Sequence, residues 1–191
     1  MKRYLVILPL LLMIVSCKSK DDNSSKSYIS IVSLVNRQVK AVDSNFAVTL
    51  RKITIRDSAH SDTTVISREQ FHEEAKAFLD IPDLSLKKIA RKYKEETPSY
   101  DNMMNRVIFS YTALDPDMVY KSQQMLVIPD NATGDKVVNI IAVSESVQNG
   151  ALVRKNLLWQ MDKSFQISSS TIRNGVVENI TTTKVVWSEG E

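Results

Sequence analysis

Cysteine and histidine are scarce in this chain, which limits the metal and redox chemistry that it can support. Cys17 is the only cysteine among 191 residues, so no disulfide can form within the chain. A zinc site built on thiolates needs several cysteines, and His60 and His72 lack the His-Glu-x-x-His spacing that places two imidazoles on one helix face. We therefore expect no metal site and interpret both histidines as polar surface residues.

Glycine is equally scarce. The four glycines are Gly134, Gly150, Gly175 and Gly190. The first three coincide with expected turns, and none belongs to a glycine-rich phosphate loop or to the Gly-x-Ser-x-Gly motif of serine hydrolases. The sequence therefore offers no nucleotide-binding motif, and we expect no cofactor. A pair of catalytic carboxylates that meets only in the folded chain stays open as an alternative.

Only one apolar run is long. It extends from Tyr4 to Val15 and follows the basic residues Lys2 and Arg3. A bilayer-spanning helix needs about 20 apolar residues, so this run is too short to be one, and its length fits the apolar region of a secretory signal peptide. Without Lys2 and Arg3 the formal charge of +3 becomes 3 − 2 = +1, which gives no reason to expect nucleic-acid binding.

The apolar run ends in Ile14-Val15-Ser16-Cys17, which resembles the lipobox of bacterial lipoproteins. That family more often has Leu at the position of Ile14. The resemblance implies that residues 1–16 are a signal peptide and that the sulfur of Cys17 carries lipid. More than one acyl chain would then anchor the protein stably in a membrane, since each buried CH₂ contributes about 0.8 kcal/mol.

The segment 17–27 holds no apolar side chain after the cysteine, a composition typical of a flexible tether. Lys18, and not Asp, follows the cysteine, which in the lipoprotein family implies transport to the outer membrane. Lys20-Asp21-Asp22 resembles the surface-export signal of some Gram-negative lipoproteins. It implies display on the cell surface, and the alternative is a tether that faces the periplasm.

Residues 28–191 show no internal repeat and no long linker, so we expect them to form a single domain. Apolar residues at helical spacing predict a helix over 28–42. Ser67 and Gln70 form a capping box that predicts the start of a second helix. Its inward residues are expected to be Phe71, Ala75, Phe78 and Leu79. A third helix is predicted over 86–93.

The rest of the domain alternates as strands. We predict them over residues 46–55, with a bulge at 51–52, and over 63–66, 105–114, 121–128, 136–148, 151–161, 164–173 and 176–187. Asn149-Gly150 and Asn174-Gly175 supply the positive φ angles of type I′ hairpin turns, and short joints make neighbouring strands antiparallel. The sequence thus predicts an α+β fold, with N-terminal helices packed on a long-stranded antiparallel meander that curls into an open sheet or half-barrel.

Four further features are candidates for function. Asp57-Ser58-Ala59 and Asp62-Thr63-Thr64 resemble the O-glycosylation signal of some Gram-negative bacteria, which implies glycans on Ser58 and Thr63. The loop 130–135 offers oxygen ligands for Ca²⁺, but hydrogen bonding within a hairpin loop explains the same residues. The basic residues over 87–94 could meet an anionic lipid surface, although a solvated face is the preferred interpretation. The aromatic residues Tyr111, Trp159, Phe165 and Trp187 could stack a ligand, but we favour a core role for them.

Three functions are compatible with these features. We favour a non-enzymatic, lipid-anchored module that binds an envelope protein or serves an envelope assembly. The first alternative is a small-ligand carrier that uses the concave face of the sheet. The second is an envelope hydrolase with dispersed carboxylates. In each case we expect the protein to be held at a membrane through the lipid on Cys17.

Overall fold

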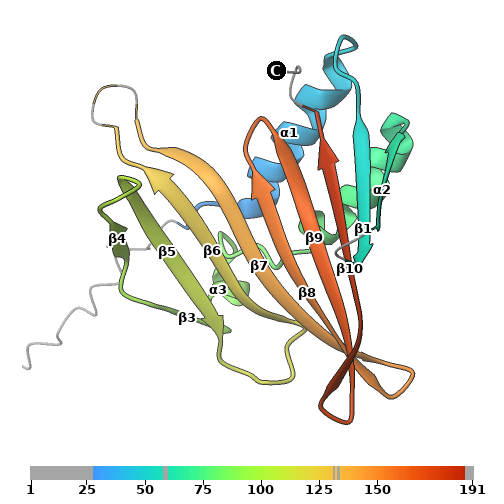
Figure 1. Cartoon of the computed structure of the whole chain (residues 1–191). Coiled ribbons are helices and arrows are strands. Elements are labelled where there is room, and N and C mark those ends of the chain that lie inside the picture. Colours follow the sequence, from blue (N-terminus) through green and yellow to red (C-terminus); the bar gives the residue numbers. More distant parts are fainter. Residues whose placement is uncertain (1–27, 58–59, 131, 133, 188–191) are drawn as a thin grey trace, which may run out of the picture.

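The computed structural model (Figure 1) describes residues 28–57, 60–130, 132 and 134–187. The predicted signal peptide, Cys17, Lys20-Asp21-Asp22 and Ser58 lie outside the described residues. Within them, no helix is long and apolar enough to cross a membrane.

The described residues form three helices: α1 (Ile31–Ser44), α2 (Arg68–Leu79) and α3 (Lys87–Ala90). Ser30 caps α1 by accepting a hydrogen bond from the Ser33 N–H at 3.1 Å. The predicted capping box begins α2: the Ser67 hydroxyl accepts from the Gln70 N–H, and the Gln70 amide oxygen accepts from the Ser67 N–H. The first two predicted helices are therefore confirmed.

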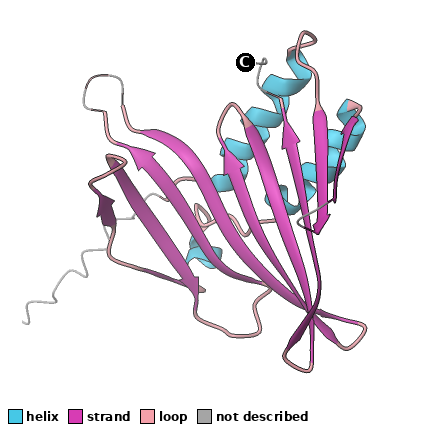
Figure 2. Ribbon diagram, viewed as in Figure 1, coloured by secondary structure: helices cyan, strands magenta, loops and turns pink. Residues whose placement is uncertain are grey.

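The same residues form one ten-stranded antiparallel sheet (Figure 2). Its strands are β1 (Arg51–Asp57), β2 (His60–Val65), β3 (Tyr93–Glu95), β4 (Ser99–Asp101), β5 (Arg106–Ala113), β6 (Tyr120–Ile128), β7 (Lys136–Gln148), β8 (Ala151–Gln160), β9 (Ser164–Arg173) and β10 (Val176–Val186). The order across the sheet is β2-β1-β10-β9-β8-β7-β6-β5-β3, and β4 also pairs with β5. The sheet is curled and does not close on itself. This arrangement confirms the predicted α+β meander.

The two Asn-Gly turns explain why β7 neighbours β8 and why β9 neighbours β10. Asn149 and Gly150 have φ angles of 50° and 72°, and Asn174 and Gly175 have 51° and 79°. Both central residues of a type I′ turn need positive φ, so these turns have the predicted type. Their twist matches that of the strands, which lets long strands coil together at the lower right of Figure 1.

Helices α1 and α2 cover one face of the sheet, which we call the helix-covered face; the opposite one is the open face (Figure 1). An aromatic cluster fills the space below α2, made of Phe71, Phe78, Trp159, Phe165 and Trp187. Phe78 lies edge-on to Trp159, and Trp159 stacks on Phe165, each with 5.0 Å between ring centroids. The core role that we predicted for Trp159, Phe165 and Trp187 is confirmed. Tyr111 is also buried, but it packs apart from the cluster, edge-on to Tyr28.

The strand predicted over 46–55 begins later, because the residues after α1 form a turn. The Asn45 N–H donates to the carbonyls of the last turn of α1, and the Asn45 side-chain oxygen accepts from the Ala47 N–H at 3.2 Å. This turn leaves Phe46 85% exposed, and β1 starts at Arg51. The predicted bulge at 51–52 is wrong as well, since the register shifts between Ile55 and Asp57.

The third predicted helix is much shorter than 86–93. It ends at Ala90, and Tyr93 instead begins β3, opposite Ala113 on β5. The Tyr93 hydroxyl donates to the Tyr120 carbonyl at 3.0 Å, so burial of this ring against distant strands overrides the local helical pattern. Leu86, which helical spacing places inward, is 57% exposed.

Candidate functional site

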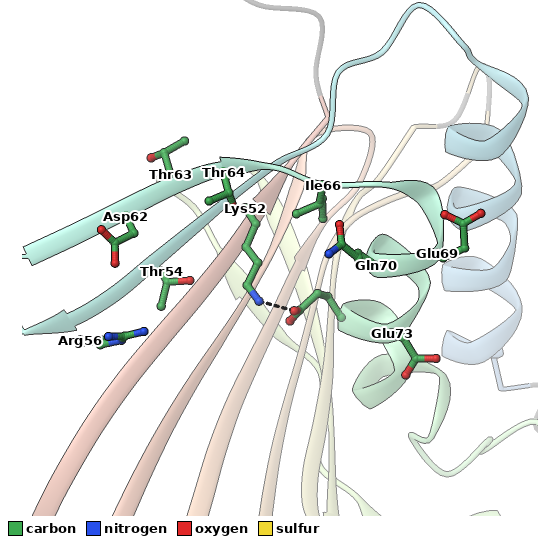
Figure 3. Close-up of a pocket in the computed structure, with 11 residues that line it drawn as sticks. Lys52, Thr54, Arg56, Asp62, Thr63, Thr64, Ile66, Glu69, Gln70 and Glu73 are labelled. Atoms are coloured by element: carbon green, nitrogen blue, oxygen red, sulfur yellow. Dashed lines mark hydrogen bonds and ion pairs between the residues drawn. The ribbon is translucent and has the colours of Figure 1, made fainter.

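The β1–β2 hairpin brings polar side chains to one face at the edge of the sheet. Its register places Lys52 opposite Thr64 and Thr54 opposite Asp62. Directly opposite residues of an antiparallel pair share a face, and successive residues alternate between faces. The four side chains therefore lie on the helix-covered face, and Thr63 lies on the open face. Figure 3 shows the Thr63 side chain pointing away from the others.

A cleft of about 640 Å³ separates this hairpin from α2 (Figure 3). We call it the α2 cleft. Its charged lining residues are Lys52, Arg56, Asp62, Glu69, Glu73 and Glu74. Lys52 Nζ donates to Glu74 Oε1 at 2.5 Å, and this ion pair joins β1 to α2 across the cleft. Both side chains are partly shielded, with 29% and 26% of their surface exposed, so the pair also fixes the distance between the helix and the hairpin.

The α2 cleft has an acidic balance. Its four carboxylates and two basic side chains give a formal charge of −4 + 2 = −2. Lys52 neutralises Glu74, which leaves Asp62, Glu69 and Glu73 against Arg56. The hydrogen bond from the Ser67 hydroxyl lowers the pKa of Glu69, which keeps this carboxylate charged. The cleft is therefore complementary to a positively charged ligand.

Strand β2 is the outer strand at this end of the sheet, and its backbone is available for pairing. The Ile66 N–H donates to the Leu50 carbonyl at 3.0 Å. Ile66 lies opposite Leu50, which continues the register of the β1–β2 pairs. Backbone groups of an antiparallel strand point alternately toward and away from the partner. Those of Thr64 therefore point toward β1, and those of Ser61, Thr63 and Val65 point outward.

These three outward residues form what we call the β2 edge. All of β2 is exposed to solvent. Among the described residues, no other strand lies beyond β2, and no backbone group pairs with Ser61, Thr63 or Val65 on the outer side. An exposed strand edge with unpaired N–H and C=O groups is a template for another extended chain.

The other candidate residues do not converge on a site. Across the described ranges, no group of three or more His, Cys, Asp and Glu side chains could hold a metal. In the loop 130–135, the Asp130 carboxylate accepts from the Ala132 N–H at 2.8 Å, and the Asp135 carboxylate accepts from the Asp130 N–H at 3.2 Å. These contacts agree with hydrogen bonding within the loop. His72 lies on the surface, with Nε2 2.9 Å from the Asp43 carboxylate.

Of the residues that the sequence singled out, Thr63 is the one that belongs to the candidate site. It lies exposed on β2, where a glycan on its hydroxyl would project from the open face. Cys17, Lys20, Asp21, Asp22 and Ser58 lie outside the described residues, so lipidation, export and glycosylation at these positions stay predictions. Sequence reasoning did not find the α2 cleft. The one available signal was the polar composition of 60–64, because a strand with so few apolar side chains has no face to bury.

We compared the chain with known proteins. No protein-family model, no curated protein and no solved structure matches it.

Proposed function

We propose that this protein is a lipid-anchored outer-membrane lipoprotein on the cell surface that acts as a non-enzymatic binding module. Its ligand is an extended, basic segment of a partner protein in the envelope. The lipobox-like Ile14 to Cys17 and the surface-export-like Lys20 to Asp22 support the location. Anchoring on the periplasmic face is the alternative location.

The binding role rests on one observation, the juxtaposition of the β2 edge with the acidic α2 cleft. A partner strand added to β2 would pair with the backbone of Ser61, Thr63 and Val65. Every second side chain of that strand would then project toward the helix-covered face, where Asp62 and Glu73 line the cleft. Backbone pairing supplies affinity, and the cleft supplies selectivity for Lys or Arg.

The two alternatives have less support. A carrier of apolar ligands needs an internal cavity, but the aromatic cluster fills the helix-covered face below α2. A hydrolase with paired carboxylates needs one of them protonated and the other free. In the α2 cleft, Glu74 is paired with Lys52. The pKa of Glu69 is lowered by its hydrogen bond from Ser67, the opposite of what a protonated acid needs.

The anchor is tested in the native bacterium. Metabolic labelling with a palmitate analogue should mark the wild-type protein, and Cys17→Ala should lose both the label and membrane association. Protease added to intact cells should cleave the protein if the domain is displayed on the surface. Absence of label on the wild type would refute lipidation, and retention of the label by Cys17→Ala would refute Cys17 as its site. Protection from protease in intact cells would assign the periplasmic face.

The binding role is tested with synthetic peptides, by fluorescence anisotropy on the whole mature protein. A peptide in which lysine and valine alternate should bind at least about tenfold more tightly than one in which glutamate and valine alternate. Asp62→Asn should weaken binding of the lysine–valine peptide by roughly two- to fivefold, because one surface charge pair contributes up to about 1 kcal/mol. The matched control Asp117→Asn, in the β5–β6 loop, should leave binding unchanged. Equal affinity for the two peptides would overturn the proposal.

A further inference from the structure

The flank of the sheet opposite the α2 cleft exposes six large apolar side chains. This flank consists of α3, β3, β4 and the ends of β5, at the left of Figure 1. Its exposed apolar residues are Leu86, Tyr100, Met103, Met104, Leu114 and Val119. Met103 is 96% exposed, the highest value among the exposed large apolar side chains of the described residues. Apolar residues gathered at one end of a domain indicate a contact surface.

The turn between β4 and β5 carries its two methionines at its tip and is held by the side chain of Asp101. The Asp101 carboxylate accepts hydrogen bonds from the N–H groups of Met103 and Met104, at 3.0 and 3.1 Å. Asn105 completes the turn with a φ of 50°. The methionine side chains contribute nothing to this geometry, so their place at the tip of the hairpin is not explained by folding. Tyr100, on β4, is 52% exposed beside them.

The same flank carries a cluster of positive charge on and around α3. Lys87, Lys88, Arg91 and Lys92 are all exposed. Within the described residues, none of the four forms an ion pair. Four unpaired cations within six consecutive positions attract a surface of anionic groups, and exposed methionine and tyrosine side chains suit the boundary between headgroups and acyl chains.

The described chain also starts at this flank. Tyr28 packs edge-on against Tyr111 of β5, with 5.6 Å between ring centroids. The segment 17–27 precedes it, and a chain of that length reaches at most about 35–40 Å when fully extended. A lipid on Cys17 would therefore keep the membrane surface within about 35–40 Å of Tyr28, where the described chain meets the flank.

We propose that this flank rests on an anionic lipid surface, with the α3 cations at the headgroups and the β4–β5 hairpin in the interfacial region. This inference rests on the proposed lipid anchor, because the tether brings the flank to the membrane. Charge complementarity distinguishes a lipid surface from a second copy of this chain. Two copies joined through this flank would bring the four α3 cations of each together, and like charges repel.

The test uses the lipidated protein in vesicles of phosphatidylglycerol and phosphatidylethanolamine with a nitroxide on the lipid headgroup or upper acyl chain. A fluorophore is attached at Met104→Cys, and in the matched control at Val65→Cys on the β2 edge, which is 72% exposed. Under the proposed function the sulfur of Cys17 is acylated, so the introduced cysteine is the one reactive thiol of each variant. We expect roughly twofold or greater quenching at position 104, because an interfacial side chain lies about 5–10 Å deep, and little quenching at position 65.

Charge variants test the second part of the inference. Replacing the four α3 cations by glutamine should abolish most of the quenching at position 104. A control with four other exposed cations replaced, namely Arg37, Lys40, Lys136 and Lys163, should retain it. Vesicles of phosphatidylcholine should reduce the quenching at position 104 in the labelled Met104→Cys protein that retains all four cations, because they lack net negative charge.

Each remaining outcome counts against the inference in a distinct way. Equal, weak quenching at positions 104 and 65 in protein that floats with the vesicles refutes the inference and leaves the anchor intact. Protein that neither carries lipid nor floats refutes the anchor together with the inference. Quenching absent at position 104, with energy transfer between fluorophores on two molecules, assigns the flank to a second copy.

Discussion

The proposed strand pairing at β2 is tested most directly by Thr63→Pro. Proline has no backbone N–H, and within sheets it is tolerated on edge strands where that N–H faces solvent. The backbone of Thr63 points away from β1, since Ile66 and Thr64 are the residues that bond toward it. The substitution should therefore leave the β1–β2 ladder intact and remove the central donor of the β2 edge.

The expected loss of affinity follows from the groups that lose their partners. One hydrogen bond to the partner strand disappears, which contributes about 0.5–1.5 kcal/mol, and a partner carbonyl is left without a donor, at a cost of about 1–3 kcal/mol. The sum of about 1.5–4.5 kcal/mol corresponds to a Kd that is roughly 10- to 2000-fold weaker. The thermal midpoint should change little, because in the free protein the Thr63 N–H forms no hydrogen bond with a described residue.

Two controls separate this effect from other consequences of the substitution. Thr63→Val removes the hydroxyl, and with it any glycan, but retains the N–H, so it should bind the lysine–valine peptide as the wild type does. Thr64→Pro removes an N–H that points toward β1 and should lower the thermal midpoint. Anisotropy titrations and thermal denaturation of the three variants complete the test. If Thr63→Pro binds as tightly as Thr63→Val, the partner does not pair with β2.

Three further predictions concern stability and modification. Phe78→Ala should lower the free energy of unfolding by about 3–5 kcal/mol in denaturant titrations, whereas Phe46→Ala, at a side chain that is 85% exposed, should change it by less than about 0.5 kcal/mol. Burial raises the pKa of Tyr111 from 10.0 to about 12, so the stability that its protonated hydroxyl contributes should be complete below pH 10 and be lost as the pH rises to 12. Burial also raises the pKa of Tyr120 to about 12, so Tyr111→Phe should make the alkaline decline in the free energy of unfolding shallower without removing it. Mass spectrometry of the native protein should find glycans on Ser58 and Thr63, and bare peptide at both would refute the glycosylation signal.

The elements that the sequence predicted well are those decided by neighbouring residues. The capping box at Ser67 needs only Gln70 three positions later, and the structure shows both of its hydrogen bonds. The Asn-Gly turns need only their own φ angles, and they pair β7 with β8 and β9 with β10. Because Phe78 follows the same helical spacing as Phe71, the core-facing side of α2 was predictable too.

The errors arise where distant contacts decide the conformation. The segment 86–93 has helical spacing, yet Tyr93 leaves the helix to pair with Ala113 and to reach the Tyr120 carbonyl. The α2 cleft was not predictable for the same reason. Its ion pair joins Lys52 to Glu74, and only the curl of the sheet around α2 brings these two residues together.

The two ends of the sheet are chemically opposite, and this contrast connects the proposed binding role to the proposed anchor. The path from β2 to β3 crosses nine strands, hence eight spacings, which amounts to roughly 38 Å along the curled sheet. The acidic α2 cleft lies at the β2 end, and the basic, methionine-bearing flank lies at the β3 end, where Tyr28 leads to the tether. An anionic membrane would favour contact with the basic β3 end over contact with the acidic end, because its headgroups have the same sign as Asp62 and Glu73. The β2 edge would then be presented away from the lipid, toward the partner, and quenching at position 65 as strong as at position 104 would contradict that orientation.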